Sequence, residues 1–246
     1  MEKFIQKITI RSYQTDLHAQ ASITALFNYM LEAAWAHAQE MKWGYDELKN
    51  NHLFWVLSRL YLKIEKYPSW QDEITLNTWS SGTDGMYAYR EFVLENDNHE
   101  VLLRCSTAWL ILDLETKRIY KLRKYIDTFP RLKDEEACRK PKRIKPLDHY
   151  ENLSFSPVRY SELDVNKHFN SVKYLERVID DFESEFLDRH ELASLEVNYL
   201  KEGMAGDFLA IDTQKLDDGN CLSTVVRESD GVDLCTMITK WRKRGE

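Results

Sequence analysis

The sequence lacks an apolar run that approaches the roughly 20 consecutive residues needed to span a membrane. Its first five residues carry no signal-peptide pattern, so we expect a cytoplasmic protein with no membrane partner. The four cysteines show no C-x-x-C spacing and the seven histidines are scattered, which predicts reduced thiols and no metal site. No glycine-rich phosphate loop is present, and we expect no cofactor.

Charge is unevenly distributed along this acidic chain of 246 residues. The formal net charge is −7, yet residues 117–145 hold twelve Lys and Arg against four Asp and Glu. That stretch is +8, which leaves −15 for the remainder. A nucleic-acid-binding protein is more often basic overall, so we expect no nucleic-acid partner and favour a compact acidic protein partner. A solvated, lysine-rich linker is the alternative.

The first half predicts one strand, one helix and then four long strands. Residues 4–11 alternate as a strand does, and residues 23–40 have a helical pattern that Ser22 opens. Further strands are expected over residues 53–65, 73–79, 87–94 and 101–112, with turn-forming residues between them. This order indicates an antiparallel sheet that wraps one helix.

The same order returns in the second half. A strand over residues 155–160 and a helix over 171–187 precede strands over 192–200, 207–216, 221–228 and 232–241. The repeat distance of about 147 residues predicts a degenerate duplication. We expect an α+β fold in which two helix-wrapping antiparallel sheets join edge to edge into one continuous sheet.

The residues between the two halves look different. They are basic, contain three prolines and show little periodicity, which is typical of a linker or crossover. We therefore divide the chain into an N-terminal unit (1–115), a basic linker (116–150) and a C-terminal unit (151–246).

A polar loop directly precedes the second helix. Residues 164–171 read Asp-Val-Asn-Lys-His-Phe-Asn-Ser, and Asn170 or Ser171 can cap the helix. Asn166 and His168 should then lie near free backbone N–H groups at the positive end of the helix dipole. Such a place can polarise a carbonyl or bind a developing oxyanion. An ordinary Asn-rich cap beside a surface histidine would explain the same residues.

Several short motifs, in their order, resemble those of the fatty acyl–acyl carrier protein thioesterases of plants and their bacterial relatives. In the second half, residues 164–174 resemble the family's active-site run and residues 199–202 its Tyr-x-x-Glu segment. The matching pieces of the first half are residues 10–13, 37–39, 55–60, 66–72 and 78–79. The resemblance implies a double hotdog fold and cofactor-free hydrolysis of a fatty acyl–carrier thioester to a free fatty acid, within fatty acid biosynthesis. The lack of a transit-type segment favours a bacterial-type member.

The resemblance also supplies the catalytic candidates, with one departure. Plant members usually carry a cysteine after the glutamate of the Tyr-x-x-Glu segment, where this chain has Gly203. We therefore expect no Cys–His pair. The expected site is an acid–base set made of Asp164, Asn166, His168 and Glu202.

The roles within this set stay open at this point. Asn166 could bind the carbonyl oxygen or position the attacking water, and His168 could act as the general base near neutral pH. Glu202 is placed by the resemblance alone, and it could orient His168 or activate water itself. Asp164 could orient Asn166 or His168, or attack the thioester carbon directly through an anhydride.

The first half is expected to be non-catalytic. It has Asp16, His18 and Gln20 where the second half has its aspartate, asparagine and histidine, so the amide and the imidazole do not match. We expect its cavity to take the acyl chain, although the same apolar residues could simply be core. The expected lining residues are Met30, Ala33, Ala34 and Trp55.

The basic stretch is the expected contact for the small, acidic carrier protein. The candidates are Lys117, Arg118, Lys121, Arg123, Lys124, Arg139, Lys140, Lys142 and Arg143. Such a contact mainly speeds the encounter and weakens with salt. A chain with two halves needs no partner subunit to complete its fold, and we expect a monomer or a homodimer.

Two other functions fit the same pattern. A different hotdog thioesterase could act on acyl-coenzyme A, in which case the free cofactor ester would be a good substrate. A non-catalytic acyl-binding or regulatory module would bind acyl groups without turnover and would tolerate the loss of His168 or Glu202. A hotdog hydratase fits less well, because its typical motifs are not matched.

Overall fold

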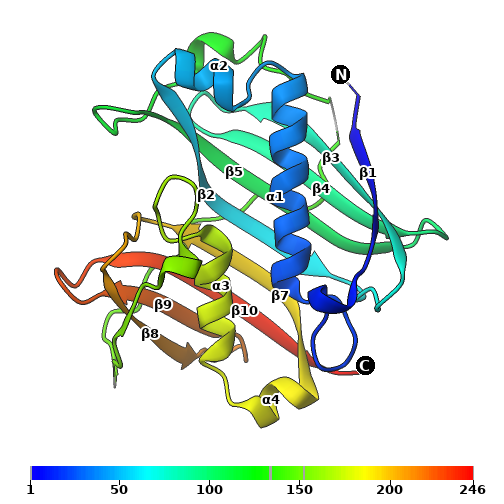
Figure 1. The fold of residues 1–246 in the computed structure, drawn as a ribbon, viewed down its shortest axis with the longest axis vertical. Coiled ribbons are helices and arrows are strands. Elements are labelled where there is room, and N and C mark those ends of the chain that lie inside the picture. The colour runs from blue at the N-terminus through cyan, green and yellow to red at the C-terminus, as the bar shows by residue number, and fades with distance from the viewer. Residues whose placement is uncertain (1, 133–134, 152, 246) are drawn as a thin grey trace. The chain divides into compact units, whose positions relative to one another are not determined.

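The computed structural model describes residues 2–132, 135–151 and 153–245. The chain forms two compact units, residues 1–141 and residues 142–246. Each unit has an antiparallel sheet and its own helix (Figure 1). The boundary between the units falls inside the stretch that the sequence predicts as a linker. No helix of the described residues is long and apolar enough to cross a bilayer.

The first unit is built on five strands. They are β1 (Phe4–Thr9), β2 (Leu53–Ile64), β3 (Glu73–Thr83), β4 (Ala88–Asn96) and β5 (Val101–Asp113), paired in the order β1-β3-β4-β5-β2. A short 3-10 turn, η1 (Ser12–Gln14), follows β1, and α2 (Tyr45–Asn50) precedes β2. These strands lie where the alternating pattern predicts them, and each neighbouring pair is antiparallel.

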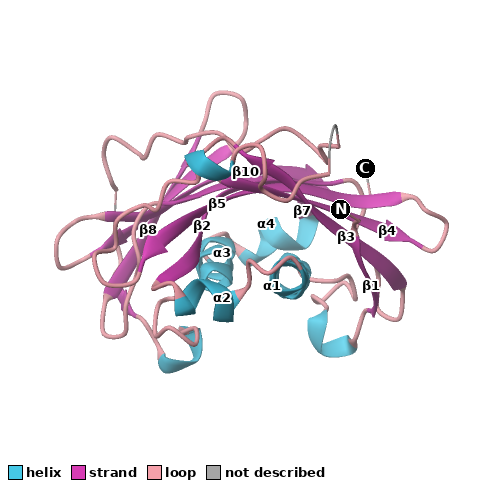
Figure 2. Cartoon of the chain, turned by 90° about the horizontal axis from the view of Figure 1, so that it is seen from above, coloured by secondary structure: helices cyan, strands magenta, loops and turns pink. Residues whose placement is uncertain are grey.

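Helix α1 (Ile23–Glu40) lies against one face of this sheet (Figure 2). It begins after Ser22, whose side chain accepts a hydrogen bond from the Ala25 N–H, as the sequence predicts. Its buried residues recur at helical spacing and form the apolar stripe that packs on the sheet. They are Ile23, Leu26, Phe27, Met30, Ala33, Ala34 and His37.

The second unit repeats this plan. Its strands are β6 (Ser156–Pro157), β7 (His190–Tyr199), β8 (Phe208–Lys215), β9 (Cys221–Arg227) and β10 (Asp233–Lys243), paired in the order β7-β10-β9-β8-β6. The 3-10 turn η3 (Tyr160–Glu162) leads into the polar loop, and the helices are α3 (Ser171–Asp180) and α4 (Ser184–Arg189). Helix α3 buries Val172, Tyr174, Leu175 and Val178.

Two predicted elements of the second unit are wrong in length. The helix expected over residues 171–187 ends at Asp180, and α4 is separate. The reason is that Phe182 and Phe186 pack on Trp241, with ring centroids 4.9 and 5.3 Å away, and so follow a different surface from α3. The strand expected over residues 155–160 shrinks to Ser156–Pro157. Proline lacks the N–H that would extend the ladder, and η3 follows at once.

The segment between β5 and β6 packs closely, unlike a free linker. It contains the 3-10 turn η2 (Arg123–Tyr125). The side chains of Leu122 and Phe129, both from this segment, are buried in a hydrophobic core cluster. Further on, the Trp79 indole donates to the Glu135 carbonyl at 2.8 Å. In the second unit the Ile144 N–H donates to Asn198 Oδ1 at 2.8 Å. Glu135 and Ile144 are therefore each bonded to the sheet of their own unit.

Candidate active site

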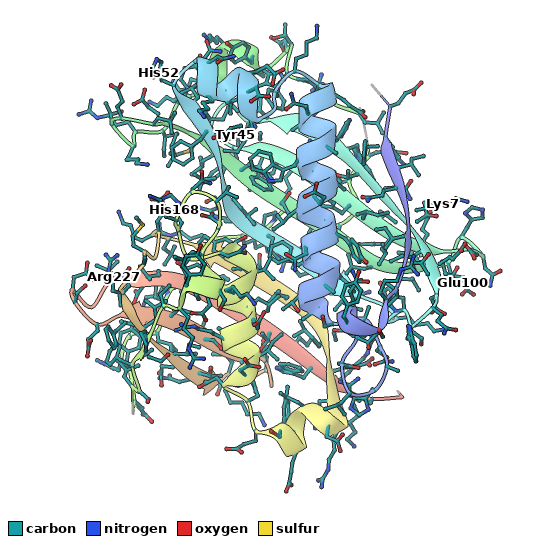
Figure 3. The ribbon with its side chains drawn as sticks, viewed as in Figure 1. Lys7, Tyr45, His52, Glu100, His168 and Arg227 are labelled. Carbon is teal, nitrogen blue, oxygen red and sulfur yellow. The ribbon has the colours of Figure 1, made fainter. Side chains whose placement is uncertain are left out.

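The polar loop before α3 is shaped by one aspartate. Asp164 Oδ1 accepts hydrogen bonds from the N–H groups of Asn166 at 2.8 Å and His168 at 3.0 Å, and its own N–H donates to the His168 carbonyl at 2.9 Å. This tight turn places Lys167 at a φ of 65°. Asn170 then caps α3 by accepting from the Val172 N–H at 2.8 Å. The predicted position of His168, on the loop entering a helix N-terminus, is thus confirmed (Figure 3).

A second loop, which follows β7, runs beside the first. The Phe169 N–H donates to the Gly203 carbonyl at 2.8 Å, and His168 forms an isolated antiparallel bridge with Met204. The Gly203 N–H donates to the Tyr174 hydroxyl oxygen at 3.0 Å, which ties this loop to α3. Burial raises the pKa of Tyr174, so the phenol keeps its proton. Pairing of the two loops brings residue 202 alongside residue 168.

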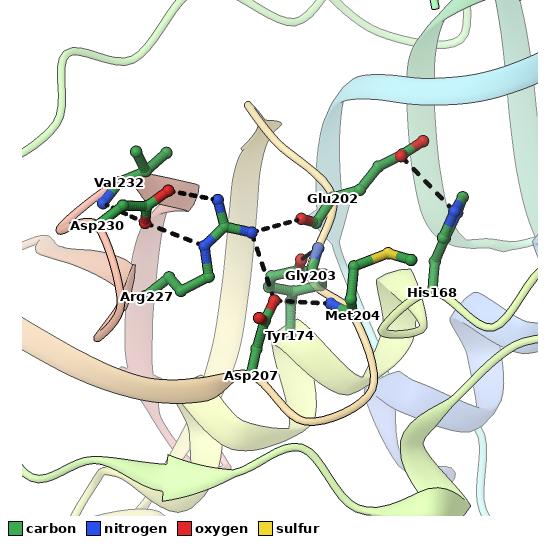
Figure 4. Close-up of polar contacts among 9 residues, drawn as sticks. All are labelled: His168, Tyr174, Glu202, Gly203, Met204, Asp207, Arg227, Asp230 and Val232. Carbon is green, nitrogen blue, oxygen red and sulfur yellow. Dashed lines mark hydrogen bonds and ion pairs between the residues drawn. The ribbon is translucent and has the colours of Figure 1, made fainter. Parts of the chain in front are cut away.

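His168 and Glu202 face each other across these loops (Figure 4). Nε2 of His168 lies 3.6 Å from Oε2 of Glu202, and the side chains are 19% and 35% exposed, respectively. This separation is that of an ion pair and is longer than a direct hydrogen bond. A carboxylate at this distance can orient the imidazole ring. The pair thus places an imidazole and a carboxylate, two groups used in general acid–base catalysis, at a position open to solvent.

The other two candidates do not join this pair. The contacts of the Asp164 carboxylate are to the loop backbone. Asn166 is exposed at the tip of the turn, and its side chain makes no hydrogen bond with a described residue. The structure thus brings together two of the four predicted catalytic residues.

Fewer backbone N–H groups are free at this helix start than the sequence suggests. The N–H groups of residues 166–170 all donate within the second unit, and so does that of Val172. The side-chain amide of Asn166 is a polar donor still available at the loop tip, beside the exposed ammonium of Lys167. The backbone therefore offers few free N–H donors for an oxyanion at this helix start.

Gly203 sits where a side chain would be crowded. A Cβ at this position would lie 3.0 Å from the Tyr174 hydroxyl and 3.1 Å from the Phe169 Cβ. The nearest downstream thiol in sequence, Cys221, is on β9, where burial raises its pKa. The four cysteines are free, and none is paired with His168 among the described residues.

Sequence reasoning missed the group that holds the Glu202 loop from the other side. Arg227, at the end of β9, pairs with Asp230 at 2.7 Å and with Asp207 at 3.4 Å. Its Nη1 also donates to the Glu202 carbonyl at 3.4 Å (Figure 4). In the sequence these residues read only as a strand end and two turns. No periodicity or motif in a single sequence connects them.

The first unit has the same loop without the same chemistry. Asp16 Oδ1 accepts from the N–H groups of His18 at 2.9 Å and Gln20 at 3.1 Å, and Ala19 has a φ of 57°. The Ala21 N–H donates to the Pro68 carbonyl, as that of Phe169 does to Gly203. By this correspondence Gln20 occupies the place of His168, and Tyr67 the place of Glu202.

The first unit also holds a cavity of about 540 Å³, its open mouth included. Of the expected lining residues, Ala34 and Trp55 line it, whereas Met30 and Ala33 are buried elsewhere in the core. Most of the lining is aromatic or small, and much of it was not anticipated from the sequence. The full set is Ala34, Trp35, Ala38, Met41, Trp43, Gly44, Trp55, Ser80, Ala88, Tyr89, Arg90, Trp109 and Phe129.

The nine basic candidates for carrier binding are all exposed. In the first unit several of them lie over aromatic rings, which holds the side chains at the surface. Lys117 Nζ is 4.7 Å from the Phe54 ring centroid, and the Arg139 guanidinium carbon is 3.6 Å from that of Tyr61. Lys142 and Arg143 belong to the second unit.

Comparison with known proteins identifies related sequences over almost the whole chain. The sequence models of the acyl-ACP thioesterase N-terminal and C-terminal domains match residues 1–128 and 144–243. A chloroplastic palmitoyl-acyl carrier protein thioesterase of Cuphea hookeriana is 27% identical over 263 residues, which cover 98% of this chain. The chain spans 62% of the length of that relative, less than two thirds.

Solved structures show the fold. An acyl-ACP thioesterase of Bacteroides thetaiotaomicron superposes with a TM-score of 0.89 at 22% identity, covering 98% of both chains. The 12:0-ACP thioesterase of Umbellularia californica superposes with a TM-score of 0.88 at 23% identity and the same coverage. The predicted α+β double hotdog fold is therefore confirmed. Because the two domain models together match most of its length, this chain belongs to the acyl-ACP thioesterase family.

Proposed function

We propose that this chain hydrolyses the thioester of a fatty acyl–acyl carrier protein to a free fatty acid and the carrier thiol. The observation that carries the proposal is the His168–Glu202 pair, 3.6 Å apart at the entrance to α3, in a chain of this family. The names of the plant relatives, which are palmitoyl- and oleoyl-acyl carrier protein thioesterases, support this substrate class.

In the proposed reaction a water oxygen adds to the thioester carbonyl carbon, and a water proton passes to the His168–Glu202 pair. The C–S bond then breaks, and the pair returns that proton to the leaving sulfur. A carboxylic acid and a thiol result, and the enzyme is unchanged. The exposed amide of Asn166 is the proposed donor to the carbonyl oxygen, because most backbone N–H groups nearby are engaged.

We assign Asp164 a positioning role. Its carboxylate already accepts two backbone N–H groups of the loop that carries His168. A direct attack by this carboxylate on the thioester would compete with those hydrogen bonds. The first unit, which has Gln20 and Tyr67 at the matching places, is proposed to be non-catalytic and to bind the acyl chain in its aromatic cavity.

The deciding experiment is hydrolysis of acyl–carrier protein by wild type, His168→Ala, Glu202→Gln and Asn166→Ala. Loss of one proton-transfer group is expected to lower kcat by about 10²–10⁴-fold. His18→Ala, at the first-unit position that matches Asn166, is the control and should keep wild-type kcat. Unchanged rates in all three second-unit variants would refute the site.

The carrier is proposed to dock on the exposed basic side chains of residues 117–124 or on those of residues 139–143. A carrier-dependent enzyme should hydrolyse the matching coenzyme A ester poorly. Equal kcat/KM on both esters would favour the acyl-coenzyme A alternative. A cytoplasmic location stays a prediction, as does a monomeric or homodimeric state; the plant relatives are named as chloroplastic.

A further inference from the structure

The aromatic cavity of the first unit contains a charge that its function as an acyl pocket does not require. Arg90, on β4, lines the cavity and is only 7% exposed. Among the described residues that line the cavity, Arg90 is the one with a charged side chain. No carboxylate among the described residues pairs with it. A buried, unpaired charge is costly, so its presence in an apolar wall needs an explanation.

The partners of Arg90 are neutral. Its Nη1 lies 2.9 Å from His37 Nδ1 and donates to Thr78 Oγ1 at 3.2 Å. Burial, with Arg90 adding to it, lowers the pKa of His37 to about 4, so the imidazole is neutral near pH 7 and accepts through Nδ1. Burial lowers the pKa of Arg90 itself to about 10, which still leaves it protonated. The guanidinium thus keeps a full charge without a counter-ion among the residues that the structure describes.

One edge of this guanidinium is unused. Nη1 donates to the two neutral partners, His37 and Thr78. Nε and Nη2 make no hydrogen bond with a described residue. The fully enclosed side-chain atoms without a partner, among the described residues, are Glu47 Oε2 and Thr236 Oγ1. The Nε and Nη2 atoms of Arg90 are therefore not fully enclosed by protein, and Arg90 belongs to the cavity lining. Nε and Nη2 together present the two parallel donors that bind a carboxylate.

The rest of the cavity lining suits an apolar ligand. Two of its indole N–H groups already donate within the protein, that of Trp55 to the Trp43 carbonyl and that of Trp109 to Thr107 Oγ1. Ser80 donates to the Pro130 carbonyl. Burial of an aliphatic chain against these aromatic walls is favourable.

We propose that the cavity binds an aliphatic chain that ends in a carboxylate, with the carboxylate on the Nε–Nη2 edge of Arg90. This chemistry has two sources. One is a free fatty acid, which is the product of the proposed reaction. The other is an acyl chain that is carrier-bound at one end and carries a carboxylate at the other, and this second source rests on the proposed function.

The first arm of the test measures binding to the full chain by calorimetry, with decanoate and decan-1-ol as probes. The wild type is expected to bind decanoate about tenfold more tightly than the alcohol, the usual worth of a charge-assisted bidentate contact. Arg90→Met should remove the preference and leave alcohol binding intact. Arg104→Met, on the neighbouring strand β5 and outside the cavity lining, is the matched control and should keep the preference.

The second arm measures hydrolysis of carrier-bound chains of equal length with and without a terminal carboxylate. A kcat/KM about tenfold higher for the carboxylated chain, lost in Arg90→Met, would identify the substrate source. A preference in the binding arm alone would identify the free acid. If no thioester is hydrolysed, the proposed function fails. The binding arm then still tests whether Arg90 binds the carboxylate of an aliphatic chain.

The proposal is overturned if the wild type shows neither preference, or if a preference survives in folded Arg90→Met. Circular dichroism and thermal melting establish that the variants fold. Should Arg90→Met not fold, Arg90→Lys replaces it, since it keeps the charge without the two-donor edge; an undiminished preference there also overturns the proposal. Ala38→Trp, which fills the cavity but leaves Arg90, is expected to weaken acid and alcohol alike.

Discussion

Asp164 Oδ1 accepts a hydrogen bond from the backbone N–H of His168 at 3.0 Å, and thereby fixes the turn on which the imidazole is carried. In the first unit Asp16 Oδ1 makes the equivalent bond with the N–H of Gln20 at 3.1 Å. The first unit keeps this aspartate although it has no imidazole at that place. The shared role of the two aspartates is therefore to shape the backbone, as Asx turns commonly do.

This relationship predicts different results for two substitutions at one position. Asp164→Asn keeps an oxygen acceptor for the turn and is expected to retain most of kcat. Asp164→Ala removes the acceptor and is expected to lower the free energy of unfolding by about 1 kcal/mol, with a lower kcat from a displaced His168. Steady-state hydrolysis and urea denaturation measure both effects. Asp16→Ala is the control, with a similar loss of stability and no loss of kcat.

The alternative role of Asp164 gives the opposite pattern. If its carboxylate attacked the thioester carbon, Asp164→Asn would abolish turnover as fully as Asp164→Ala, because an amide cannot form the anhydride. An inactive, fully folded Asp164→Asn protein would therefore replace the positioning role with a nucleophilic one.

Gly203→Cys introduces a thiol directly after Glu202, and it should impair this protein. The new Cβ would lie 3.0 Å from the Tyr174 hydroxyl and 3.1 Å from the Phe169 Cβ, so the loop must shift. We expect a loss of about 1–3 kcal/mol in the free energy of unfolding and a reduced kcat from movement of Glu202. Denaturant melts and iodoacetamide inactivation check this. A stable, faster variant that iodoacetamide inactivates would mean that the site accommodates thiol chemistry after all.

Glu91 predicts a pH effect on stability. Burial raises the pKa of its carboxyl from 4.5 to about 7, although Ser81, Ser106 and the Ala137 N–H donate to it. The folded state thus binds this proton more tightly than the unfolded state, so stability falls as pH rises from about 4.5 to about 7 and levels off above. Glu91→Gln should lack this fall and gain on the order of 1–3 kcal/mol relative to wild type at high pH.

Denaturation series from pH 5 to pH 8 measure this difference. Glu95→Gln, at a partly buried glutamate on the same strand, is the control for the substitution itself. A Glu91→Gln protein with the wild-type pH slope would show that the carboxylate is stabilised in its charged form by its three donors.

The basic residues of the first unit predict a salt-sensitive carrier effect. Changing Lys117, Lys121 and Lys124 to Glu should raise KM for acyl–carrier protein several-fold at low salt and leave small thioesters unaffected. The same changes at high salt should matter less, because screening already weakens the contact. Changing Lys63, which already pairs with Glu65 at 2.7 Å, is the control. An equal loss on carrier-bound and small thioesters would point to a folding defect.

The elements of the fold were largely predictable because local signals and tertiary packing agree. The Ser22 cap and the apolar spacing of α1 are short-range signals in the sequence. The strands are also marked locally, by alternating apolar and polar residues with turn-forming residues between them. The helix break at Asp180 was not predictable, since Phe182 and Phe186 continue the helical spacing while their partner, Trp241, is distant in sequence. The cap by Asn170 and the place of His168 followed from the polar run itself.

The site was predictable only in part, because long-range pairing decides it. Glu202 came from the family resemblance, and the loop-to-loop hydrogen bond of Phe169 with Gly203 explains its place beside the imidazole. Nothing in the sequence marks Arg227 as a support of that loop or Arg90 as a cavity residue. Both depend on which strands become neighbours, and a single sequence does not encode that in any short pattern.

Four of the seven tryptophans, which are Trp35, Trp43, Trp55 and Trp109, line the cavity of the first unit. Indole emission responds to the polarity around the ring. The intrinsic fluorescence of these tryptophans therefore reports on the cavity in which a chain would bind. Displacement of water by an aliphatic guest should shift that emission to shorter wavelength without any attached dye. Occupancy of the cavity could then be followed in real time during turnover.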